Sequence, residues 1–219
     1  MELFTRTRTG MTLTPAGQAL AGETPAVLAG WDHAPRETKA AASRADQVLR
    51  VGFMSSAANE ATQQIIAAFT CRRPGWRVDL QQAAGSDPTA RLASGDVGAA
   101  LLRLPFPGQD DVRIEVLLTE PRWVVLPDTH PLADKGEIPF GKLWDEAWVA
   151  AIANGYGIAL APESAARYYA RPGIAYRPVT GVSPSQAGVA WPPANDSNPV
   201  VQDFVRCCLD SKPAGTPPS

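Results

Sequence analysis

The amino-acid sequence predicts an α/β fold built around an open, largely parallel sheet. From Leu49 to Ala150, short apolar runs of strand type alternate with amphipathic runs of helical spacing, and this alternation is typical of βαβ units. The chain has 219 residues, which is enough to bury a core of ordinary size. Its net charge of −2, with 19% charged residues, excludes a strongly basic protein that wraps nucleic acid.

The N-terminal segment combines a basic turn with the start of a helix. The stretch LFTRTRTGMTLTPAGQAL (residues 3–20) carries Arg6 and Arg8 in the turn. Thr14 followed by Pro15 is a favourable helix opening, because the hydroxyl can accept an unpaired backbone amide and proline suits the first helical position. We therefore expect a helix that begins at Pro15.

This helix carries an apolar stripe and two prolines. Four apolar residues recur at helical spacing, which is typical of a surface that packs on a partner; they are Leu20, Val27, Leu28 and Trp31. Pro25 and Pro35 each remove a backbone hydrogen bond, at a cost of about 3 kcal/mol inside a helix. We therefore expect the helix to be kinked or broken, with residues 35–47 forming a solvated helix end or a linker.

The α/β unit that follows shows its elements in regular order. Residues 48–54 (VLRVGFM) predict a strand, which is followed by a tight turn and a helix. The run WRVDLQQA predicts a half-buried strand, DPTARLASGD a short helix closed by Gly95, and VGAALLRLP a buried strand that ends at Pro105. Two apolar strands lie on either side of Glu120-Pro121, and a short helix and the start of another strand come before residue 150.

The C-terminal part contains a few shorter elements. We expect a strand over Ile158–Ala161, a helix from Pro162, two further strands within 174–181 and 186–193, and an amphipathic helix within 198–209. These elements are too few to predict a second sheet. Residues 210–219 (DSKPAGTPPS) have the composition of a disordered tail.

No catalytic or metal-binding motif is present. The sequence has no nucleophile elbow, phosphate loop, HExxH pair or complete dinucleotide loop, so we expect no enzyme activity, no metal site and no cofactor. Cys71, Cys207 and Cys208 form neither a metal-ligand spacing nor an even disulfide framework, and we expect reduced thiols.

The chain shows no targeting segment. No run approaches the roughly 18 apolar residues of a membrane span, and the N-terminus lacks the apolar core of a signal peptide. We therefore expect a cytoplasmic protein without a membrane partner.

Two serines follow the first strand of the α/β unit. Ser55 and Ser56 fall between a strand's carboxyl end and a helix start, where open α/β sheets bind ligands and where helix amides favour anions. Serines at this position are also common helix caps. Both readings, a cap alone and a cap that contacts a ligand, remain open at this point.

In order along the chain, these segments resemble the bacterial LysR-type transcriptional regulators. Residues 3–20 are similar to the wing of a winged helix-turn-helix and the start of the linker helix. LRVGF, IIAAFTCRRPGWRVDL and LASGDVGAALLR are similar to the first effector subdomain, and NGYGIALAPES to a segment near the family's C-terminus. The resemblance covers most of residues 3–209.

The resemblance implies a domain organisation. Residues 1–13 would be a remnant of the wing, 14–47 the linker helix, and 48–209 an effector domain of the periplasmic-binding-protein type (type 2). Within that domain, 48–150 would be the first lobe and 151–209 an incomplete second lobe with a return segment.

The resemblance also implies partners and sites. Arg6 and Arg8 would contact DNA phosphates, which adds affinity but reads no sequence. A small-molecule effector, for which a carboxylate is our expectation, would lie between the lobes. Its contacts would be Ser55, Ser56, Arg103, Pro105, Tyr156 and Gly157. The apolar stripe of the linker helix predicts homo-oligomers.

The sequence departs from the family pattern in two places. The helix-turn-helix that family members carry ahead of the wing is not found before residue 3, and the body of the second lobe is not found between Ala151 and Ile152. We therefore expect specific DNA binding to be impaired. The alternatives are a binding module like a solute-binding protein, with no DNA role, and a non-functional gene remnant.

Overall fold

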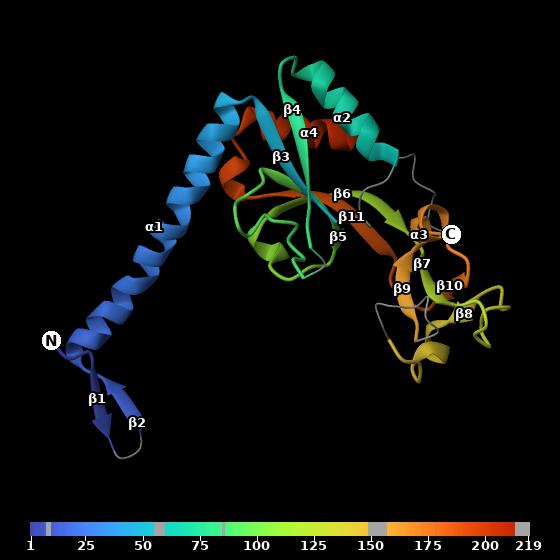
Figure 1. Ribbon diagram of the computed structural model, residues 1–219, viewed down its shortest axis with the longest axis horizontal. Helices are drawn as coiled ribbons and strands as arrows, with labels where there is room; N and C mark the ends of the chain where they lie inside the picture. The colour runs from blue at the N-terminus through green and yellow to red at the C-terminus, as the bar shows by residue number, and fades with distance from the viewer. Residues whose placement is uncertain (8–9, 55–59, 85, 149–156, 213–219) are drawn as a thin grey trace. The chain divides into compact units, whose positions relative to one another are not determined.

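The computed structural model describes residues 1–219 except 8–9, 55–59, 85, 149–156 and 213–219. Contacts divide the chain into two compact units, Met1–Gln47 and Val48–Ser219 (Figure 1). Among the residues described, no helix is both long enough and apolar enough to cross a membrane.

The first unit is a hairpin joined to one long helix. Strands β1 (Phe4–Thr7) and β2 (Gly10–Leu13) pair antiparallel, and α1 runs over Pro15–Ala45. The predicted cap is confirmed, since the Thr14 hydroxyl accepts the amide of Gly17 at 3.1 Å. A Cβ at Gly17 would collide with the carbonyl oxygen of Leu3. The LTPAG sequence thus lets the start of the hairpin lie directly against the first turn of α1.

The linker helix was expected to be kinked or broken, and the second alternative, a break, is wrong. Helix α1 continues through Pro25 and Pro35. Each proline removes one backbone donor, but the other hydrogen bonds of this 31-residue helix remain, and propagation of a formed helix needs no new nucleus. The stripe predicted on this helix is exposed within its own unit, with Leu20 51%, Val27 68%, Leu28 56% and Trp31 77% accessible.

The second unit contains a five-stranded sheet, sheet 1, with the order β4-β3-β5-β11-β6. Its strands are β3 (Val48–Phe53), β4 (Arg77–Gln82), β5 (Ala99–Leu104), β6 (Arg113–Glu120) and β11 (Ser185–Trp191). The predicted parallel pairing holds for β3 with β4 and β5, whereas β11 pairs antiparallel with both β5 and β6. Sheet 1 is therefore mixed, because a strand from the C-terminal part enters between β5 and β6.

Two helices pack side by side on sheet 1 (Figure 1). They are α2 (Glu60–Arg72) and α4 (Pro199–Asp210), and the rings of Phe69 and Phe204 meet edge to face with centroids 5.8 Å apart. Both rings are fully buried with Val51, Leu101 and Val189 in one apolar core. The amphipathic helix predicted over 198–209 is confirmed.

A second sheet, sheet 2, corrects the expectation that the C-terminal elements are too few to form one. Its order is β8-β10-β7-β9, with β7 (Arg122–Pro127), β8 (Ile138–Pro139), β9 (Ala159–Pro162) and β10 (Ile174–Thr180). Strand β7 was expected to belong to the first α/β unit. It pairs instead with β9 and β10, antiparallel to both, and so completes a second sheet. The short helix α3 (Glu163–Tyr168) follows β9.

The connection before β5 also differs from expectation. Residues 88–95 form successive turns and not a helix. The Asp87 carboxylate accepts the amides of Thr89 and Arg91, at 3.0 and 2.8 Å, and Ala90 and Arg91 adopt positive φ. An aspartate that binds nearby amides in this way competes with helical hydrogen bonds. Gly95, with φ +67°, ends the turns where a helix stop was predicted.

In the part of the chain that the structure describes, three short 3₁₀ helices lie in the connections. They span Gln109–Asp111, Phe140–Leu143 and Pro193–Asn195. The second of these coincides with the short helix predicted before residue 150, and a single bridge between Trp148 and Ile158 follows it.

Candidate functional site

The chain passes between the two sheets at two adjacent connections. One joins β6 to β7 at Glu120–Arg122, and the other joins β10 to β11 through Gly181, whose φ is +74°. Ser185 is paired with Glu120 in the register of sheet 1, and the Arg122 guanidinium donates to the carbonyl of Ser183 at 2.9 Å. The two connections therefore lie side by side, and polar side chains at the ends of several strands converge there.

Four of these side chains form what we call the junction network: Arg103, Glu120, Ser164 and Ser185. The Arg103 guanidinium donates to Glu120 Oε1 at 2.6 Å and to the hydroxyls of Ser185 and Ser164 at 3.4 and 3.3 Å. Glu120 Oε2 accepts the backbone amide of Ser164 at 2.7 Å, and Oε1 accepts its hydroxyl at 3.1 Å. Strands β5, β6 and β11 of sheet 1 are thereby tied to the first turn of α3, beside sheet 2.

The ion pair in this network is shielded from water. The side chains of Arg103 and Glu120 are 14% and 8% exposed, and Ser185 is buried. Breaking such a buried pair by removing one partner leaves an uncompensated charge, which costs about 3–5 kcal/mol. The Arg103 guanidinium is already paired with the carboxylate of Glu120. An incoming anion therefore has to compete with Glu120 for this guanidinium.

The structure places the predicted effector residues at different positions. Arg103 lies in the junction network, and Pro105 is exposed directly after the end of β5. Gly157 has φ +71°, a conformation that favours glycine, and it precedes β9 at the end opposite to α3. The topology therefore does not bring Gly157 to Arg103. The other three predicted residues, Ser55, Ser56 and Tyr156, lie outside the described residues.

Sequence reasoning missed three members of the network: Glu120, Ser164 and Ser185. The one available signal was Glu120, an acidic residue that ends an apolar strand just before Pro121. Ser164 and Ser185 stand in ordinary helix-start and strand-start positions. Their role depends on which strands become neighbours, and local patterns do not carry that information.

Two arginines were predicted to contact DNA, and the structure describes one of them, Arg6, in the hairpin of the first unit. Arg6 lies on β1 opposite Met11 and is exposed. Arg8 lies outside the described residues.

The three cysteines are free thiols. Cys71 is exposed, and Cys207 and Cys208 are buried in α4. Burial raises the pKa of both buried thiols above its usual range, so they stay protonated and pack as apolar groups. No group of His, Cys, Asp or Glu that could hold a metal ion occurs among the residues the structure describes.

Comparison with known sequences gives the family. The profile of the LysR substrate binding domain matches two segments, residues 42–151 and 145–213. A small neutral protease regulatory protein of Streptomyces coelicolor is 32% identical over 155 residues, which is 67% of this chain and 45% of that protein. The Hca operon transcriptional activator HcaR of Escherichia coli is 27% identical over 143 residues, 65% of this chain and 48% of that protein. The chain thus spans about half the length of these relatives.

Solved structures with the same fold include other members of that family. A full-length OxyR variant from Pseudomonas aeruginosa has a TM-score of 0.56 at 19% identity, and the match covers 94% of this chain and 84% of that one. The effector-binding domain of BenM, solved with its effector benzoate, has a TM-score of 0.56 at 18% identity and covers 74% of this chain and 90% of that one. These likenesses show the α/β fold of LysR effector-binding domains. The match to the family profile over most of its length shows that this chain belongs to the LysR family.

Proposed function

We propose that this protein is a LysR-type transcriptional regulator that senses a small molecule at the junction between sheets 1 and 2. The observation that carries the proposal is the junction network, which joins three strands of sheet 1 to the first turn of α3 through one buried carboxylate. Small-molecule sites commonly lie where two such lobes meet. The relatives include a regulatory protein and a transcriptional activator.

The effector proposed for this site is a small carboxylate. Arg103 is the cation that such a ligand would use, and Glu120 already holds it at 2.6 Å. The ligand must therefore displace Glu120 or share the guanidinium with it, and much of the binding energy is lost in that exchange. We expect weak binding, with a Kd in the millimolar range, which corresponds to roughly −4 kcal/mol.

The test is a calorimetric or NMR titration of the full chain with benzoate and propionate. Glu120→Gln removes the competing charge but keeps the shape of the side chain, so it should tighten binding of both probes. Arg103→Gln should abolish binding. The matched control is Glu115→Gln, because Glu115 lies exposed on the same strand and should leave the affinity unchanged.

Three results would contradict this account of the site. Micromolar affinity in the unaltered chain would contradict the weak binding expected and would mean that further groups complete the site. Weak binding that is unchanged in Arg103→Gln would place the ligand elsewhere. A Glu120→Gln variant that binds no tighter would show that Glu120 does not compete with the ligand.

For DNA, we propose that residues 1–47 contribute only weak, salt-sensitive binding. This segment has five basic residues and five acidic residues, so it has no net attraction for phosphates. The basic residues are Arg6, Arg8, Arg36, Lys39 and Arg44, and the acidic ones are Glu2, Glu23, Asp32, Glu37 and Asp46. Fluorescence anisotropy with duplex DNA at two salt concentrations tests this, and nanomolar, sequence-selective binding at physiological salt would contradict it.

We further propose that the second lobe is shorter than that of typical family members. The support is that the family profile matches in two segments, both of which contain residues 145–151. On this proposal, the chain lacks the part of the second lobe that typical family members carry between these two segments.

A further inference from the structure

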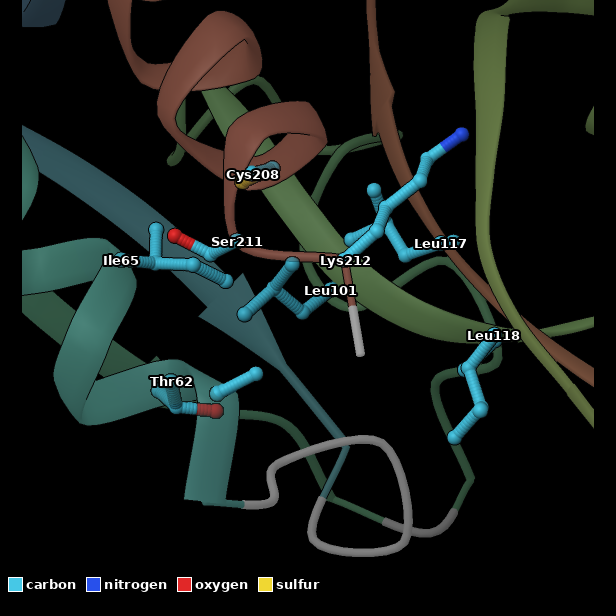
Figure 2. A pocket seen from close by; sticks show the side chains of 11 residues that line it. Thr62, Ile65, Leu101, Leu117, Leu118, Cys208, Ser211 and Lys212 are labelled. Carbon is cyan, nitrogen blue, oxygen red and sulfur yellow. The ribbon is translucent and has the colours of Figure 1, made fainter. Parts of the chain in front are cut away.

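Sheet 1 contains a pocket that is separate from the junction network. It lies between α2 and the end of α4, and we call it the α2–α4 pocket (Figure 2). Its walls include Thr62 and Ile65 of α2, Leu101 of β5, Leu117 and Leu118 of β6, and Ser211 after α4. None of the four network residues lines it.

The walls of the pocket are apolar and tightly built. Ile65 and Leu101 are each 3% exposed, and Cys208, which also lines the pocket, is 1% exposed. The buried Cys208 thiol stays protonated and therefore behaves as an apolar surface. A ligand in this pocket would meet hydrocarbon and one neutral thiol on most sides.

Small residues line the pocket where strand β11 changes register. The shift occurs between Ala187 and Gly188, and both residues line the pocket together with Ala61 of α2. A Cβ at Gly188 would lie 2.7 Å from the carbonyl oxygen of Glu115, so the close approach of β6 requires glycine there. Ala61 and Ala187 contribute only methyl groups to the lining.

The size of the pocket selects a slender ligand. The volume within reach of the centre of a water-sized sphere is about 20 Å³, and the pocket opens to solvent. A slender alkyl chain suits so narrow a space better than an aromatic ring.

The polar groups of the pocket are uncharged except for Lys212. The hydroxyls of Thr62 and Ser211 belong to its lining, and a hydroxyl oxygen can both donate and accept. Lys212 is the one charged residue among the described residues that line the pocket, and Figure 2 shows its ammonium group directed away from Thr62 and Ile65. A carboxylate in this space would lose hydration without gaining a counter-charge, which is unfavourable.

We propose that the α2–α4 pocket is a second small-molecule site, and that it binds an uncharged, unbranched aliphatic alcohol with its methyl end between Ile65 and Leu101 and its hydroxyl at Ser211. This site would bind a neutral ligand, whereas the junction network would bind an anion. The two proposals are tested independently of each other.

The probe for the test is 1-butanol, with butyrate as the charged molecule of the same chain length. Titration of the methyl-labelled full chain should give saturable NMR shifts at Leu101, Leu117 and Leu118, with a Kd on the order of millimolar, as expected for so few ligand atoms. Butyrate should shift these methyl groups at least about tenfold more weakly, because its charge has no partner in the pocket.

Two pairs of variants localise the site. Ala61→Leu fills the pocket and should weaken binding by at least about tenfold, since a misplaced methylene or two has effects of this size. Ala68→Leu, on the exposed face of the same helix, should have no effect. Ser211→Ala should weaken binding about threefold, in line with one neutral hydrogen bond, and the exposed Ser197→Ala should not.

Thermal unfolding of each variant confirms that it folds before its binding is compared. Shifts that do not saturate, butyrate binding as tightly as 1-butanol, or an Ala61→Leu variant that binds like the unaltered chain would each overturn the proposal. Loss of binding in Ala61→Leu but not in Ala68→Leu, with 1-butanol preferred, would support it.

Discussion

The Arg103–Glu120 pair allows the sharpest test of how the two sheets are held together. Glu120→Ala removes the carboxylate that lies 2.6 Å from the Arg103 guanidinium and 2.7 Å from the amide of Ser164. The guanidinium is 14% exposed, so water compensates it poorly. We expect a loss of about 3–5 kcal/mol in the free energy of unfolding.

This loss can be measured as a change in thermal midpoint. For a domain of this size, each kcal/mol lowers Tm by about 2–4 °C, so Glu120→Ala should unfold roughly 6–20 °C below the unaltered chain. The double variant Arg103→Met, Glu120→Leu removes both charges and should recover most of the loss, because an apolar pair of similar volume is often as stable as a buried ion pair.

The surface pair Arg113–Asp196 is the control. Its side chains are 59% and 45% exposed, and Arg113→Ala should cost no more than about 1 kcal/mol. If Glu120→Ala also costs less than 1 kcal/mol, or if the double variant is no more stable than the single one, the junction network does not hold the sheets as described.

Three further outcomes are expected. Gly17→Ala should cost about 1–3 kcal/mol through its collision with the carbonyl of Leu3, and faster hydrogen exchange of the Thr14 amide, which donates to that carbonyl, would report it. Burial raises the pKa of Asp203, but hydrogen bonds and charge from Arg73 and Arg72 outweigh this effect and lower the pKa below 3.8. The ionised Asp203 therefore stabilises the folded chain above pH 3.8, and this contribution is lost as the pH falls through the lowered pKa. Urea titrations below pH 4 should accordingly show that the free energy of unfolding depends less on pH in Asp203→Asn than in the unaltered chain. The exposed apolar stripe of α1 should drive self-association, and Trp31→Ser should shift sedimentation toward monomer; a concentration-independent monomer before the substitution would contradict this.

Local patterns predicted the strands of this chain well. The alternation of β3, α2, β4 and β5, the break at Pro121 and the amphipathic α4 could all be read from residue spacing. The helix start at Thr14 was also readable, because capping depends on neighbouring residues alone. Interactions near in sequence thus account for the elements that were predicted.

Errors arose where distant contacts decide the structure. Sheet 2 was missed because β7 pairs with β10, which begins at Ile174. The turns at 88–95 are a local exception, since Asp87 competes there for the backbone amides two and four residues ahead. At the site, Arg103 was predicted as a ligand contact, whereas its partner Glu120 was missed, since their proximity follows from strand order and not from spacing.

The insertion of β11 between β5 and β6 has a consequence for how the molecule is made. The ribosome releases β3, β4, β5 and β6, which ends at Glu120, well before Ser185 and the rest of β11 have been synthesised. Until then β5 and β6 lack the strand that lies between them, and their unpaired edges are open to association with other chains. Sheet 1 can therefore close only after β11 has been synthesised, and the edges of β5 and β6 stay open to association during that interval.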